Sequence, residues 1–376
     1  MIAFSLKGVI TAAAFLVALS PIVLIHEFGH FIVCRLVGIR VLEFSFGFGK
    51  VLWSTKKGHT QYSIRAIPFG GFVNPAGEMF VDNKDGKNTP KDYEFASKSW
   101  WKKLLMVISG ALMNYVLAFI VFTSLVFVTG VPVTDSKATP AVLGEVVANY
   151  PAQKHGLEAQ DKILKINETP VNNWQDVLNS VASLNTDLNL KYERNGEIRS
   201  LTIPFSDFNK DNPKLGIAVQ TLYTSATPLQ AFRSGLYQCW FWTKLSLTEL
   251  YKAVSKTKKL EVAGPIGIFH RVHQATQNGW MDFVWLIGLL SLAVGMFNLF
   301  PIPVLDGGYA VVFIWEGITG KLPSVKVVNI ALNVGLALLL MLVLYASVFD
   351  VKRIFIKQSS DSPAVVETVE PAENSK

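Results

Sequence analysis

Four long apolar runs constrain what this chain of 376 residues can fold into. They occupy residues 9–37, 104–128, 283–315 and 328–348, and each is long enough to cross a lipid bilayer as a helix. Half of all residues are hydrophobic, which is more than an ordinary soluble enzyme carries. The runs therefore predict a polytopic α-helical membrane protein with about four transmembrane segments, so that the lipid bilayer is an expected partner.

The segments between the apolar runs indicate the orientation of the chain. Residues 38–103 hold 11 Lys or Arg against 6 Asp or Glu. By the positive-inside rule this loop faces the cytoplasm, and the residues after the second run lie on the opposite side. The net charge of +7 does not predict nucleic-acid binding, because no basic stretch has the aromatic residues or the motif that such binding needs.

Composition and pattern divide the chain into eight parts. Glycine-interrupted strands, an Asn195-Gly196 turn signal and changes of polarity mark the boundaries. The predicted parts are a first transmembrane segment (1–37), a cytoplasmic-side loop with β hairpins (38–103), a second transmembrane segment (104–130), a mixed α/β domain (138–222), an amphipathic linker helix (228–270), a third, broken transmembrane segment (283–315), a fourth (328–348) and a disordered tail (358–376).

The third run is too long for one straight span, and "NLFPIPVLDGG" interrupts it. Pro301 and Pro303 lack the backbone donor that a regular helix requires. The backbone must therefore unwind at membrane depth, which is tolerated only where protein or a wet cavity surrounds it.

The first run contains "VLIHEFGHFIV", which places His26, Glu27 and His30 among apolar residues. Two histidines four residues apart share one face of a helix, so both imidazoles can bind one zinc ion. Glu27 is then placed to take a proton from a water activated by the metal, as in the HExxH metalloproteases. A signal peptide is the alternative reading of this run, but cleavage would remove the histidines from their helix or leave them at its frayed end.

A catalytic zinc ion of this kind needs a third protein ligand. Asp306 is the best candidate, because it is an acid at membrane depth and stands in "PVLDGG", where broken backbone and glycines allow close approach. The alternative is an ordinary turn. Asn298 could donate to a substrate carbonyl or cap the broken helix, whereas Asn114 is expected to join helices rather than to catalyse.

Taken together, these motifs resemble the site-2 protease family of intramembrane zinc metalloproteases, in particular its bacterial RseP-type branch. The resemblance extends over nearly the whole chain. It rests on "HEFGH", "FGFGK", "IRAIPFGGFV", "GALMN", "GPIGI" and "NLFPIPVLDGG", in that order, and on an insert with "YPAQKHGLEAQDKILKINETPV" that resembles a single PDZ domain. The sequence departs from the family pattern at Ala111, Gln160 and Tyr309.

The resemblance implies one catalytic Zn²⁺ held by His26, His30 and Asp306, with Glu27 as the general base. It assigns substrate handling to Asn298, Pro301 and Pro303, and to a membrane-associated β element around residues 62–73 that includes Gly70 and Gly71. It implies cleavage within the transmembrane segments of single-span membrane proteins, such as anti-sigma factors or remnant signal peptides, after another protease has trimmed them.

The same resemblance places the protein in the bacterial inner membrane, with the PDZ-like domain on the periplasmic side, where it would bind peptide ends. Two alternatives remain. A membrane HExxH protease acting on lipidated C-termini would have no PDZ-like insert and no "LDG" ligand, and both are present. A catalytically inert scaffold presenting a PDZ domain would show a damaged ligand set, and the set is intact.

Overall fold

The computed structural model describes residues 6–77, 90–133, 135–147, 149–208, 214–220, 222–255 and 264–357. The predicted disordered tail, residues 358–376, lies outside them. The chain forms two compact units. The first contains the residues up to and including Val128 together with residues 227–352, and the second contains residues 129–226.

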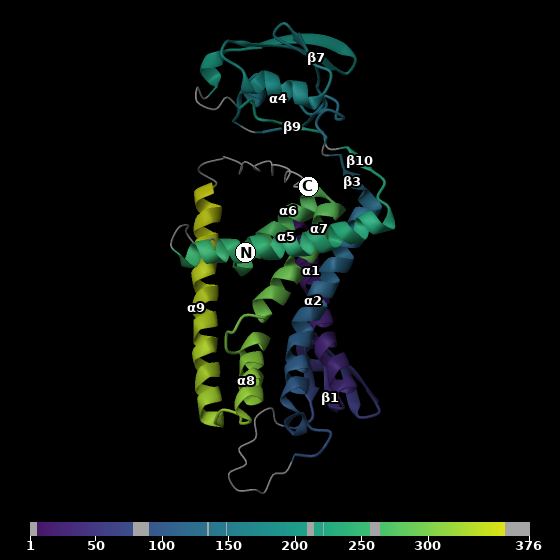
Figure 1. Cartoon of the computed structure of the whole chain (residues 1–376), viewed down its shortest axis with the longest axis vertical. Helices are drawn as coiled ribbons and strands as arrows, with labels where there is room; N and C mark the ends of the chain where they lie inside the picture. The colour runs from purple at the N-terminus through teal and green to yellow at the C-terminus, as the bar shows by residue number, and fades with distance from the viewer. Residues whose placement is uncertain are drawn as a thin grey trace. The chain divides into compact units, whose positions relative to one another are not determined.

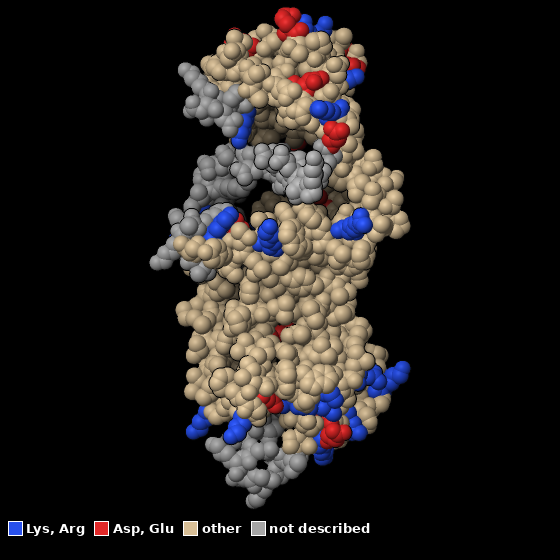
Figure 2. All heavy atoms as spheres, viewed as in Figure 1, with Lys and Arg blue, Asp and Glu red and all other residues tan. Residues whose placement is uncertain are grey.

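Four helices within the described residues are long and apolar enough to cross a membrane. They are α1 (Leu6–Leu36), α2 (Trp100–Thr129), α7 (Trp280–Asn298) and α9 (Val325–Lys357). Figure 1 shows all four in the first unit, and Figure 2 shows a broad band over them almost free of charged side chains, with Lys and Arg above and below it. The protein is thus an integral multi-pass membrane protein, as predicted.

Helices α1 and α2 approach each other closely at a glycine. A methyl group on Gly29 would lie 2.5 Å from the backbone oxygen of Ser109. The two helices then share a core with the strands that follow α1, in which Phe31, Cys34 and Met106 are buried. The Cys34 thiol is free and is packed in this core.

The predicted hairpins are two long antiparallel strands, β1 (Val41–Lys57) and β2 (Thr60–Pro75). They fold over so that residues 43–46 pair on one side with 61–64 and on the other with 71–74, which makes four short strands from two. Gly47 (φ +87°) allows the bend, because its backbone is left-handed and a Cβ there would lie 2.6 Å from the Ile67 oxygen.

The region predicted as one linker helix (228–270) contains α5 (Pro228–Val254) and the start of α6 (Pro265–Asn278). Helix α6 has no side-chain cap of its own at Gly264. Asp350 of α9 supplies one, because its buried carboxylate accepts a 2.7 Å hydrogen bond from the Gly267 amide. The "GPIGI" glycines are therefore needed for space: a Cβ on Gly264 or Gly267 would collide with Asp350.

The third apolar run breaks where the prolines predict. Helix α7 ends at Asn298, and α8 (Asp306–Thr319) begins after a turn in which Val304 has a left-handed backbone (φ +87°). Gly307 and Gly308 let the chain fold back tightly, since a Cβ on either would lie within 2.4 Å of a carbonyl oxygen of the preceding loop. Asp306 is thereby fixed as the first residue of α8.

The second unit has its own hydrophobic core of sixteen buried residues. Its elements are β3 (Val131–Pro132), β4 (Leu143–Val146), α3 (Pro151–Lys154), β5 (Lys162–Ile166), β6 (Thr169–Pro170), α4 (Trp174–Ala182), β7 (Leu188–Arg194), β8 (Glu197–Ile203), β9 (Ile217–Val219) and β10 (Tyr223–Thr224). The main sheet has the order β6-β5-β7-β8, while β4 pairs with β9 and β3 with β10.

Two local features of the second unit follow from its sequence. Asn195 and Gly196 both have positive φ and join β7 to β8, as predicted for an Asn-Gly hairpin turn. Gln160 also has positive φ (+75°), in the left-handed region that glycine favours. The next residue, Asp161, is fully buried and pairs with Arg194 through two 2.7 Å contacts, and this hydrogen bonding raises the pKa of the guanidinium.

Candidate metal centre

Helix α1 presents His26 and His30 on one face. Their Nε2 atoms lie 3.2 Å apart and both side chains are buried. The rings meet edge to face, at an interplanar angle of 82°. Because the residues are one turn apart on a regular helix, the predicted juxtaposition of the two imidazoles is confirmed.

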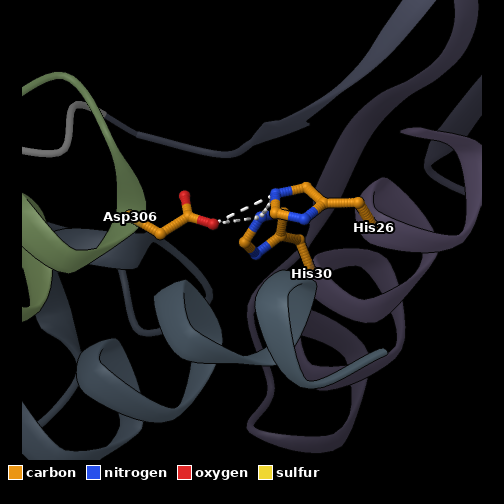
Figure 3. A group of neighbouring side chains, drawn as sticks. All are labelled: His26, His30 and Asp306. Atoms are coloured by element: carbon orange, nitrogen blue, oxygen red, sulfur yellow. Dashed lines mark hydrogen bonds and ion pairs between the residues drawn. The ribbon is translucent and has the colours of Figure 1, made fainter. Parts of the chain in front are cut away.

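Asp306 reaches the two histidines from the far end of the sequence (Figure 3). Its Oδ2 atom lies 3.0 Å from His26 Nε2 and 3.5 Å from His30 Nε2. These three residues are the one group of three or more metal-binding side chains found in the described ranges. The proline-broken loop before α8 therefore does what the sequence predicts: it brings a carboxylate to the paired imidazoles.

The spacing of the three atoms fits a zinc ion. Tetrahedral zinc with bonds of ~2.0 Å holds its ligand atoms ~3.3 Å apart, and the observed separations are 3.0, 3.2 and 3.5 Å. Two imidazole nitrogens and one carboxylate oxygen are a donor set that zinc accepts, with a fourth position left for water or substrate. Asp306 Oδ2 is also buried without a hydrogen-bond donor in the described part of the chain, as expected of an atom reserved for a cation.

Helix α2 lines the other side of the site, which sequence reasoning missed. The Met106 carbonyl lies 2.8 Å from His30 Nδ1, so it fixes the tautomer that presents Nε2 to a metal. A Cβ on Gly110 would lie 2.4 Å from His30 Nε2 and 2.7 Å from His26 Nε2. Asn114, expected only to join helices, lies 3.2 Å from His26 Nδ1. The quoted motif "GALMN" holds two of these residues, but its chemistry depends on a helix-to-helix contact that sequence does not reveal.

Glu27 points toward the folded hairpin. Its carboxylate lies near the Val73 backbone, and its Cγ lies 3.5 Å from the position that a Cβ on Gly71 would take. The strand 71–74 pairs on one side only, with 43–46, in the described residues. The catalytic candidate and an open strand edge are therefore neighbours.

The remaining predicted residues do not reach the three ligand atoms. The Asn298 amide donates to the Val294 carbonyl one turn earlier in α7, which corresponds to the helix-end alternative. Pro303 packs its backbone oxygen against α9, where a Cβ on Gly335 would lie 2.5 Å from it. Gly70 has a left-handed backbone (φ +90°) at the hairpin bend, against the Phe48 ring. Pro301 is exposed. Their part in substrate handling stays a prediction.

A buried ion pair holds α8 in register with α2. Lys103, whose side chain is 2% exposed, donates to Glu316 over 2.8 Å. Breaking a buried pair by removing one partner costs about 3–5 kcal/mol. Since Asp306 starts the helix that carries Glu316, the ion pair also holds the Asp306 carboxylate opposite His26 and His30.

The chain is similar over most of its length to bacterial metalloproteases. The Bacillus subtilis regulator of sigma-W protease RasP is 25% identical over 423 residues, covering 92% of this chain and 99% of its own. The zinc metalloprotease RasP of Oceanobacillus iheyensis is 26% identical over 427 residues, covering 92% and 100%. A Clostridium acetobutylicum protein with a provisional zinc-metalloprotease name is 32% identical over 339 residues, covering 89% and 96%. The chain is a zinc metalloendopeptidase, not an inert scaffold.

The family model for Peptidase family M50 matches residues 14–342. The chain belongs to that family, the site-2 proteases, as the resemblance of its motifs predicts.

Proposed function

We propose that this protein cleaves the membrane-embedded segments of single-span membrane proteins, using one zinc ion held by His26, His30 and Asp306. The observation that carries the proposal is the convergence of three buried ligand atoms at 3.0–3.5 Å, contributed by residues far apart in the sequence. When bound, zinc supplies Lewis-acid activation of the attacking water and of the scissile carbonyl.

The residues of the chain have distinct roles in this proposal. Glu27 takes the proton of the attacking water and later gives it to the leaving amine. Met106 fixes His30 through its carbonyl. The open edge at 71–74 receives the unwound substrate as an added strand, which places a substrate carbonyl beside Glu27. Unwinding is necessary because every backbone group of an intact transmembrane helix is already hydrogen-bonded. The segment that precedes Asp306 in the sequence would contact the substrate through Asn298, Pro301 and Pro303.

The wider context of the proposal follows the family. Residues 138–222 would form a single PDZ-like domain outside the cytoplasm, which binds peptide ends by strand addition. Its antiparallel sheet, its helix α4 and its separate core support an independent domain. The protein would lie in a bacterial inner membrane and act on anti-sigma factors or remnant signal peptides after a first protease has trimmed them. This substrate class is supported by the similarity to the regulator of sigma-W protease RasP of Bacillus subtilis, with which nearly the whole chain aligns.

Metal removal tests the proposed function. The purified full-length chain is reconstituted in lipid vesicles with a single-span substrate whose extracytoplasmic part has been trimmed. We expect cleavage within the substrate's membrane segment, its loss after treatment with 1,10-phenanthroline, and its return when zinc is added back. Cleavage that persists in the metal-free protein, or cleavage confined to the soluble part of the substrate, would contradict the proposal.

A further inference from the structure

The paired histidines need a fixed tautomer. A histidine that binds a metal through Nε2 carries its proton on Nδ1, and that proton requires an acceptor. For His30 the acceptor is the Met106 carbonyl, which cannot donate, so the tautomer is determined. For His26 the group at Nδ1 is the side-chain amide of Asn114, 3.2 Å away. The function of Asn114 therefore depends on which end of its amide faces the imidazole.

The acceptor that a protonated His26 Nδ1 needs determines which end that is. The Asn114 side chain is fully buried, and its Oδ1 has no hydrogen-bond partner in the part of the chain that the structure describes. With Nδ2 toward His26, two donors would face each other once Nδ1 is protonated. Rotating the amide by 180° exchanges two atoms of nearly the same shape. In that orientation Oδ1 accepts the Nδ1 proton, and the NH2 group takes the former position of Oδ1.

Helix α7 packs against Asn114 and fixes its position in α2. Ser291 donates a 2.9 Å hydrogen bond to the Asn114 backbone oxygen. A Cβ on Gly295 would lie 3.1 Å from the Asn114 Cβ, so the two helices are in close contact at this residue. Because α7 leads into the loop that ends at Asp306, one packed unit supports both the carboxylate ligand and the amide.

We propose that Asn114 is a positioning residue of the metal centre: its amide oxygen accepts the Nδ1 proton of His26 and so directs Nε2 toward the zinc ion. This inference rests on the proposed ligand set. Each histidine then has its own acceptor from α2, a backbone carbonyl for His30 and a side chain for His26. Without an acceptor, His26 can move its proton to Nε2 and lose the lone pair that binds zinc.

The test is the zinc affinity of the metal-stripped, full-length protein in detergent, measured by competition with a chromogenic chelator. Asn114→Leu keeps the volume and removes the acceptor, and we expect zinc binding about 10–100-fold weaker, the effect usual for a lost outer-shell partner. Asn114→Asp offers only acceptor oxygens, so it should bind zinc at least as tightly as wild type. Thr123→Val is the matched control, since Thr123 Oγ1 is another buried, unpartnered polar atom of α2 in the described residues. It should leave the zinc affinity unchanged.

The outcomes separate this inference from the proposed function. Wild-type zinc affinity in Asn114→Leu would overturn the role of Asn114 and leave the ligand set intact, whereas a wild-type chain that binds no zinc would overturn the ligand set itself. A merely structural role would lower the thermal stability of the metal-free protein without changing its zinc affinity. If Asn114→Leu does not fold, Asn114→Asp decides: affinity equal to wild type supports the inference, and a tenfold loss overturns it.

Discussion

Replacing Glu27 with Gln is expected to lower kcat by about 10²–10⁴-fold, the usual contribution of a general base, while zinc stays bound. The substitution keeps the shape of the side chain and its position beside Val73, but an amide cannot take a proton from the attacking water. Glu27 does not belong to the trio of converging ligand atoms, so zinc affinity should not change. Single-turnover cleavage of the reconstituted substrate and zinc content by atomic absorption are the two measurements.

The control for Glu27 is an equally conservative change at a distant acid. Glu249→Gln alters a half-exposed α5 residue that pairs with Lys252, and it should cleave at the wild-type rate. Cleavage by Glu27→Gln within tenfold of that control would remove Glu27 from the role of base. Loss of zinc together with activity would instead make Glu27 part of the metal site.

Gly110→Ala is the second substitution with a large expected effect. The prediction follows from the lack of room for a methyl group at this position. The added methyl would lie 2.4 Å from His30 Nε2 and 2.7 Å from His26 Nε2, closer than a methyl carbon can approach either nitrogen. Either the imidazoles rotate away or α2 moves, and both displace the ligand atoms. A misplacement of about 1 Å commonly costs a hundredfold in rate. We expect cleavage to fall by about a hundredfold or more and zinc affinity to fall with it.

Leu112→Ala is the matched control for Gly110→Ala, because it changes an exposed α2 residue two positions away. It should retain zinc and activity. Thermal unfolding of the metal-free proteins distinguishes a local clash from a general loss of packing: a local clash lowers zinc affinity more than it lowers the apoprotein's Tm. A Gly110→Ala protein with wild-type zinc affinity and cleavage would show that α2 does not pass against the imidazoles as described.

The parts of the site that sequence could predict are those governed by local rules. The spacing of His26 and His30 determines their shared face, because helical periodicity is local. Asp306 could be predicted because an acid at membrane depth beside prolines has few uses other than function. The four membrane helices follow from length and polarity in the same way. In each case one segment holds all the information.

What sequence could not predict depends on contacts between distant segments. Gly110 and Asn114 matter because α2 crosses α1 at a particular height, which is set by the close approach at Gly29. The hairpin's double pairing depends on bends at glycines whose register is not evident from alternation. The "GPIGI" motif could be recognised but not explained, because its partner, Asp350, lies 83 residues later.

The most direct measurement of the central claim is the zinc content of the purified wild-type chain beside Asp306→Ala, with Asp282→Ala as a control at the start of α7. The account predicts one zinc ion per chain in the wild type and in Asp282→Ala, and a large loss of bound zinc in Asp306→Ala, because Asp306 is the carboxylate that joins the two imidazoles in the described ranges of the chain. One tightly held zinc ion in the Asp306→Ala protein, or none in the wild type, would contradict it.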